Sequence, residues 1–276
     1  MRNLILIEIN NCINRREFKF IFAILLILSC TSFFIDSIAF YGQDLSFIRS
    51  SAEQSLIQST YSTFLLSTLL ILLPLLSSSI YADSYYTDYK NGVLKNILSR
   101  IDHKSYIKSK VIVIFIMTFI TFFISLTINQ ILVMISFPLE GFDNKFSLPA
   151  YDYGIQNYSN QVLFDLLRMN HPLLYNFLNI SIISLFSGII GVLSFSIYFI
   201  NSNNRITNII MVFIVYIISE LFFSYMHASY FSLYNQLKPG SESSITTLVI
   251  WSIGLLVVSI YILYTKGNKL GKEFGD

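Results

Sequence analysis

Six long apolar runs constrain this chain more than any other feature of its sequence. They cover roughly residues 18–40, 60–80, 111–137, 173–200, 206–226 and 245–264. About 20 helical residues are enough to cross the ~30 Å hydrocarbon core of a bilayer. Backbone groups in lipid must find hydrogen bonds within the protein, and these runs lack the alternation of barrel strands. We therefore expect an all-α membrane protein whose six transmembrane helices form a single domain over residues 1–276.

The composition agrees with a membrane protein and argues against a nucleic-acid partner. Only 12% of the 276 residues are charged, 54% are hydrophobic, and the mean hydropathy is +0.63. Soluble domains carry about 25% charged residues. The formal net charge is only +2, and no basic stripe with interleaved aromatic residues is present. We expect membrane lipids around the protein and no nucleic acid bound to it.

Lysine and arginine are distributed unevenly among the segments that join the apolar runs. With the N-terminus inside, 14 of the 18 Lys and Arg residues fall on inner segments and four on outer segments. Inner loops of membrane proteins carry such an excess. We therefore expect a multi-pass protein of the cell membrane, of bacterial type, with both termini in the cytoplasm.

Residues 2–17 form an amphipathic stretch ahead of the first apolar run. At 100° per residue, an apolar side that includes Ile5, Ile9 and Cys12 lies opposite a polar side that includes Glu8 and Asn11. This pattern favours a helix lying in the membrane interface. The alternative is a simple extension of the first spanning helix.

The connector, residues 81–110, is a polar and densely basic interruption between the second and third runs. Asp88 precedes Gly92 by four residues, and Leu94, Ile97 and Leu98 follow at helical spacing. An amphipathic helix with such an apolar ridge can dock into a groove on another protein. The alternative is a solvated loop whose leucines pack on the helix ends. The residue pattern leaves both interpretations open.

The connector resembles the first cytoplasmic loop of permease subunits in the type-2 ABC exporter family. The matching positions are Asp88, Gly92, Leu94, Leu98, Lys104 and Lys110. Asp88 stands where Glu is usual in that family, Val93 where Thr is common, and Lys104 where Arg is common. The resemblance implies a cytoplasmic coupling helix between spans 2 and 3. It also implies that an ABC ATPase subunit docks on Asp88, Gly92, Leu94, Ile97, Leu98, Lys104 and Lys110.

The resemblance further implies an ATP-driven exporter in which this chain is the membrane-spanning subunit. Such permeases pair with a second copy or a related permease, and ATP and Mg²⁺ are held by the partner ATPase. The nearest phosphate-loop pattern here, residues 267–273, has one residue too few between its glycines and Glu273 where Ser or Thr is needed. We therefore expect no catalytic residue, cofactor or metal on this chain. The expected cargo is amphipathic or hydrophobic: a bacteriocin-like peptide first, a lipid or drug second.

Two other functions remain open at the level of sequence. One is a membrane immunity or sensor protein that binds a toxic peptide without an ATPase. The other is an intramembrane hydrolase, which the sequence supports less. The three histidines, His103, His171 and His227, are scattered among separate segments. Neither a His-Glu-x-x-His metal motif nor a Gly-x-Ser-x-Gly nucleophile turn occurs.

A few residues within the runs also suggest roles. Glu220 is the only acidic residue deep in a run, so it either lines a cargo path, makes a buried polar contact or lies near the outer interface. Asp36 is expected at a solvated helix end. Small side chains in the fourth run predict close helix packing, either within the chain or between two copies. These packing residues are Ser184, Ser187, Gly188 and Gly191.

Overall fold

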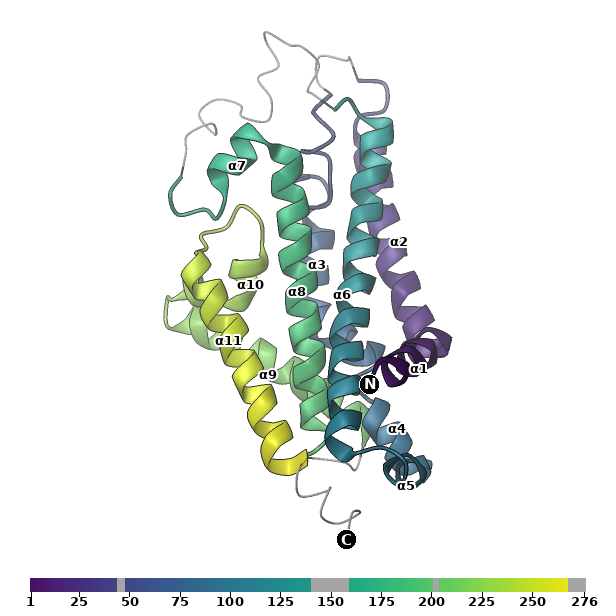
Figure 1. The fold of residues 1–276 in the computed structure, drawn as a ribbon. Coiled ribbons are helices and arrows are strands. Elements are labelled where there is room, and N and C mark those ends of the chain that lie inside the picture. The colour runs from purple at the N-terminus through teal and green to yellow at the C-terminus, as the bar shows by residue number, and fades with distance from the viewer. Residues whose placement is uncertain (44–47, 140–158, 201–203, 268–276) are drawn as a thin grey trace.

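The computed structural model describes residues 1–43, 48–139, 159–200 and 204–267, and every regular element in these ranges is helical apart from one isolated β-bridge. Figure 1 shows a bundle of long helices with short helices at both ends. The helices are α1 (Arg2–Asn14), α2 (Arg16–Ala39), α3 (Thr63–Ile80), α4 (Ser84–Lys90), α5 (Val93–Leu98), α6 (His103–Ser136), α7 (Asp165–Asn170), α8 (Pro172–Ile197), α9 (Arg205–Tyr225), η3 (Ser229–Phe231), α10 (Leu233–Leu237), α11 (Ile245–Ile262) and η4 (Leu263–Gly267).

Six of these helices are long and apolar enough to cross a membrane. They are α2, α3, α6, α8, α9 and α11, the last of which continues directly into η4. Each coincides with one of the six expected runs. Over the described residues, the prediction of an all-helical fold with six helices able to span a membrane is therefore confirmed, as in a multi-pass membrane protein.

The helix α8 forms the centre of the bundle. It packs against α6, α3 and α11, and most of its residues are buried. The outer helices α2, α9 and α11 instead bury few of their residues, and their exposed side chains are largely apolar, such as Ile27, Ile214 and Val257. A helix that is apolar all round in this way is suited to lipid on its outer face.

The helix α6 is longer than the run that predicted it. It begins at His103, inside the connector, rather than near residue 111, and has 34 residues. At 1.5 Å per residue it is about 51 Å long, well beyond the ~30 Å hydrocarbon core. Asp102 caps it by accepting a hydrogen bond from the backbone N–H of Ser105 at 3.3 Å. Polar residues at the start of α6 hid this extension, because hydropathy detects only the part of a helix that lipid covers.

The small residues of α8 serve close packing inside the chain. A Cβ added at Gly188 would lie 2.9 Å from the ring of Phe115 and 3.1 Å from its carbonyl oxygen. At Gly191 it would lie 3.2 Å from Thr118 Oγ1. Ser184 and Ser187 are also buried, and their hydroxyls donate to carbonyls of α8 itself. The two glycines therefore let α8 approach α6 closely, which is helix packing within the chain and not between two copies.

Asp36 is not a solvated helix end, as the sequence suggested. It is fully buried in α2 and accepts hydrogen bonds from Ser59 Oγ at 2.5 Å and Ser62 Oγ at 3.3 Å. The chain segment at residues 50–59 supplies one of these donors and is itself almost entirely buried. This segment turns back into the end of the bundle, so Asp36 is covered by protein and not by water.

Side-chain amides hold that buried segment in place. Asn176 of α8 donates to the carbonyl of Ala52 at 2.7 Å and to Gln130 Oε1 at 2.9 Å. Asn129 of α6 accepts from the backbone N–H of Leu56 at 2.8 Å. Buried backbone outside helices is costly unless its polar groups are paired. The amides supply those partners and close this end of the bundle.

The α6–α8 contact predicts an asymmetry between two glycine variants. Gly188→Ala should destabilise the protein by about 1–3 kcal/mol, because the added methyl group meets the ring and backbone of Phe115. Gly254→Ala, on α11, has open space and should be neutral or slightly stabilising. The thermal midpoint of detergent-purified protein measures both. Equal midpoints for the two variants would contradict the proposed close packing.

Candidate functional site

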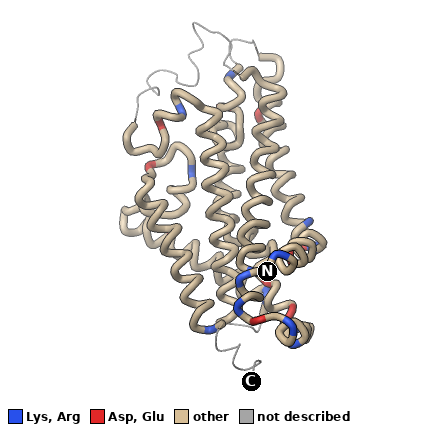
Figure 2. Tube along the Cα trace, viewed as in Figure 1, with Lys and Arg blue, Asp and Glu red and all other residues tan. Residues whose placement is uncertain are grey.

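The connector lies at the end of the bundle that also carries α1 (Figure 1). It contains α4, α5 and the first turns of α6. Gly92 joins α4 to α5 with φ of +69°, in the left-handed region, and no atom lies within 4 Å of where its Cβ would stand. Backbone conformation and not space therefore favours glycine here. Figure 2 shows Lys and Arg gathered at this end of the molecule.

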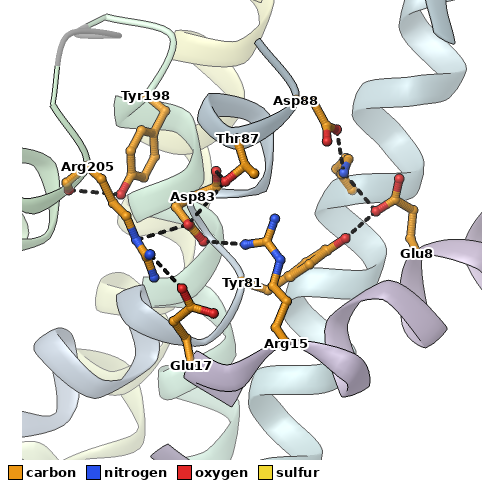
Figure 3. A network of polar contacts seen from close by, with 10 residues as sticks. Glu8, Arg15, Glu17, Tyr81, Asp83, Thr87, Asp88, Tyr198 and Arg205 are labelled. Carbon is orange, nitrogen blue, oxygen red and sulfur yellow. Dashed lines mark hydrogen bonds and ion pairs between the residues drawn. The ribbon is translucent and has the colours of Figure 1, made fainter. Parts of the chain in front are cut away.

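A buried lysine ties the connector to its surroundings. Lys110 of α6 has a side chain only 2% exposed, and its ammonium lies 2.7 Å from Glu8 of α1 and 2.8 Å from Asp88 of α4. Figure 3 shows the carboxylates of Glu8 and Asp88 near each other, with dashed contacts between them. A buried ammonium is costly unless it is paired and hydrogen-bonded. The two ion pairs of Lys110 thus hold both α1 and α4 against the start of α6.

Two tyrosines complete the hydrogen bonding around Lys110. The hydroxyl of Tyr81 donates to Glu8 at 2.5 Å, and that of Tyr106 donates to Asp88 at 2.7 Å. The rings of both tyrosines lie within 5.4 Å of the ammonium, at cation–π distance. Each carboxylate therefore receives one ammonium and one phenol, which offsets the loss of water.

A second cluster surrounds Asp83, just before α4. The side chain of Asp83 is 2% exposed and pairs with Arg15 at 2.8 Å and with Arg205 of α9 at 3.0 Å. Arg205 also pairs with Glu17 of α2 at 2.7 Å, at a more exposed position. The Arg15 guanidinium lies 4.6 Å from the ring centroid of Tyr81, which connects this cluster to the first.

We call the two clusters together the junction. Its charged residues are Glu8, Arg15, Glu17, Asp83, Asp88, Lys110 and Arg205. They come from the N-terminal segment, the connector, α6 and α9. Through these pairs the connector is fixed to three different parts of the bundle. A displacement of α4 would therefore pull on α1, α6 and α9 together.

The helix α1 is separate from α2 and does not extend it. Arg15 interrupts the two helices in an extended conformation, with φ −67° and ψ 142°. The buried residues of α1 are Glu8 and Cys12, one turn apart. The sequence pattern had put Glu8 on the opposite side from Cys12, so this assignment was wrong. The reason is that Lys110 draws the carboxylate inward, next to a thiol whose pKa burial raises to about 12.

The structure divides the predicted docking residues into an inner and an outer group. Leu94 is 3% exposed and belongs to the protein's own core, and Ile97 and Leu98 pack against that core. Asp88 and Lys110 pair with each other in the junction. Leu94 of the predicted apolar ridge therefore lies in the chain's own core, while Ile97 and Leu98 are only partly buried against it.

The remaining connector residues form an exposed face, which we call the α5 face. Its members are polar or basic for the most part. They are Asn91, Gly92, Val93, Lys95, Asn96, Ser99 and Arg100. Lys104 is exposed as well, but it lines a groove between α6 and α11 instead. The surface that the connector offers to another molecule is therefore its polar side.

Glu220 makes a partly buried polar contact in the last turns of α9, away from Arg205 at the start of that helix. Its carboxylate accepts a hydrogen bond from the backbone N–H of Tyr234 at 3.0 Å, in the first turn of α10. A carboxylate is favourable there because the first N–H groups of a helix lack partners within it. Of the three roles considered for Glu220, the polar contact is the one with an observed partner.

Sequence reasoning missed most of the junction. It assigned Arg15 and Arg205 only to the charge bias across the membrane, and it did not single out Asp83 or Glu17. One signal was available: Lys110 adjoins an apolar run, and a lysine at that depth needs a carboxylate partner. Which of the chain's 16 acidic residues would provide it depends on tertiary packing.

Removing the central ammonium should destabilise the protein strongly. Lys110→Met leaves Glu8 and Asp88 buried side by side without their cation, at a cost of about 3–5 kcal/mol. Thermal midpoints in detergent measure this loss. The triple variant Lys110→Met/Glu8→Gln/Asp88→Asn removes all three charges and should recover most of it. A triple variant no more stable than the single one would contradict the ion-pair interpretation.

Burial predicts unequal roles for the carboxylates of the second cluster. Asp83→Asn leaves two guanidiniums without their shared buried partner, so we expect a loss of about 3–5 kcal/mol. Glu17→Gln removes a carboxylate that is 39% exposed and has one partner, so its cost should stay below about 1 kcal/mol. The same thermal assay compares them. Similar losses would show that burial does not govern this cluster.

Comparisons with known proteins identify no relative. No protein-family model, curated protein or solved structure matches this chain. The case for its function therefore depends on its own residues and their geometry.

Proposed function

We propose that this chain is the membrane-spanning permease subunit of an ATP-driven exporter. In this proposal α4 and α5 couple the bundle to a separate ABC ATPase subunit, which holds ATP and Mg²⁺. The end that carries the junction faces the cytoplasm of a bacterial cell, as the excess of Lys and Arg there favours. The proposal rests on the resemblance of the connector together with one structural observation.

That observation is that α5 has one side packed on the core and the other side exposed. One side of α5 is anchored through Leu94 in the core, while Val93, Lys95 and Asn96 are exposed at the end of the bundle. The exposed cations would suit an acidic rim on the partner and fix its register. A short helix held rigidly on one side and exposed on the other can receive force from outside the membrane.

The junction offers a route for that force into the bundle. Asp88 connects α4 to α6 through Lys110, and Asp83 connects the same segment to α9 through Arg205. Arg15 and Glu17 bring in the first spanning helix. Packed helices joined by such discrete contacts move as units and do not deform continuously. Motion at α5 would therefore reach three spanning helices at once.

The remaining features agree with the same proposal. Leu6, Ile7 and Ile13 of α1 are exposed, which suits a helix lying in the cytoplasmic interface with these side chains in lipid. The outer faces of α2, α9 and α11 leave apolar surface for a second copy or a related permease. Cargo moving between such helices would be amphipathic or hydrophobic, with a bacteriocin-like peptide first and a lipid or drug second.

Charge reversal on the α5 face tests the proposal. The tagged chain, purified from its native membrane, should retain an ATPase whose nucleotide hydrolysis can be measured. Lys95→Glu/Arg100→Glu should lower the retained activity by about tenfold, because like charges would oppose an acidic partner. The control Lys108→Glu/Lys266→Glu makes the same charge change on α6 and η4, away from the α5 face, and should retain the activity.

Two results would count against this assignment. One is an original chain that retains no ATP hydrolysis under conditions that preserve its fold. The other is equal retention by the two charge-reversed variants. Either would leave the α5 face without the partner that the proposal requires.

A further inference from the structure

A groove of about 960 Å³ separates the start of α6 from the end of α11. Its walls are mostly apolar and include Ile107, Val111, Ile260 and Leu263. This volume is near the upper end of the ~300–1,000 Å³ usual for ligand pockets. The two helices meet nearby, where Ile107 lies 3.0 Å from the position of a Cβ on Gly267. The groove is therefore bounded by protein on two sides and open on its outer side.

Basic side chains line the groove at the level where α6 leaves the membrane. Lys104 and Lys108 are one helical turn apart on α6, so they project from the same face. Both are exposed, and within the described part of the chain neither forms an ion pair with a carboxylate. Asp102 is the one acidic residue among those that line the groove, and it caps α6. Lys266, exposed on η4, adds a further cation to the same end.

We propose that this groove binds an acidic phospholipid, with its phosphate at Lys104 and Lys108 and an acyl chain along the apolar walls. The level of the groove relative to the membrane favours this ligand over a soluble one. α6 is about 51 Å long and exceeds the ~30 Å hydrocarbon core, so its first turns lie at the headgroup level. Tyr264, 72% exposed on η4, also lies in the groove, as aromatic residues do at membrane interfaces.

The apolar surface continues from the groove toward the middle of the membrane. Ile116 and Ile120 of α6, and Ile253 and Val257 of α11, are all exposed. An acyl chain can follow these side chains, while the phosphate stays at the basic end. A soluble phosphate ester would use only the lysines and leave the apolar walls uncovered. The proposal does not depend on an ATPase partner, because every residue that it uses lies outside the α5 face.

Competition between lipids tests the site. The intact protein is exchanged into micelles containing equal amounts of phosphatidylglycerol and phosphatidylcholine, and native mass spectrometry counts the lipid that remains bound. We expect a preference of about fivefold or more for phosphatidylglycerol, since each basic residue attracts acidic lipid appreciably. Lys104→Gln/Lys108→Gln should reduce the preference to near one. Lys95→Gln/Arg100→Gln, the matched control on the α5 face, should keep it.

Further variants distinguish binding in the groove from adsorption elsewhere on the protein. Val111→Trp should fill the apolar wall and lower the retention of both lipids, whereas Val93→Trp on the α5 face should not. An original protein without lipid preference would overturn the proposal. An equal loss of lipid preference in Lys104→Gln/Lys108→Gln and in Lys95→Gln/Arg100→Gln would also overturn it, because any positive charge would then attract the lipid. Displacement of the lipid by inorganic phosphate, or stronger lipid binding after removal of residues 268–276, would assign the groove to another occupant and overturn it as well.

Discussion

The arrangement of this protein depends on one buried ammonium. Lys110 stands between Glu8 and Asp88 at distances of 2.7 and 2.8 Å, with almost no access to water. Separating it from either carboxylate would leave a charge in a poorly solvated place, which is far more costly than breaking an exposed ion pair. This penalty fixes where α1 lies, where α4 lies and how α6 enters the bundle. The helix α1, too short to be stable alone in water, is thereby held against the spanning helices.

The buried polar groups at the two ends of the bundle have different kinds of partners. The end with the connector uses a connected set of charged pairs. The opposite end relies more on neutral amides such as Asn129 and Asn176, beside the buried carboxylate of Asp36 and the local ion pair of Asp165 with Arg168. Between the two ends, Gly188 and Gly191 let α8 pack closely against α6. Amides and glycines hold a fixed packing. Ion pairs add long-range directionality, and they are concentrated at the end where we propose that a partner acts.

The sequence predicted the spanning helices well because their signal is local. Each run is apolar over a bilayer thickness, and Gly92 marks the turn before α5 in the same local way. The failures share a different cause. The pattern around Leu94 predicted an amphipathic helix but not which surface would cover its apolar side. Glu8 and Asp36 were assigned to polar, solvated positions because their partners are distant in the sequence. Periodicity defines a face, and tertiary packing alone decides what that face touches.

Stability alone does not account for the junction. Buried ion pairs can often be replaced by apolar residues at no loss of stability, and this chain is otherwise rich in such residues. Only 12% of its residues are charged, yet seven of them meet here and nearly satisfy one another. Apolar contacts would allow the connector to slide or rotate over the helix ends. Paired charges with tyrosine donors favour one register, so in the proposed exporter a displacement of α5 would be transmitted with a defined direction.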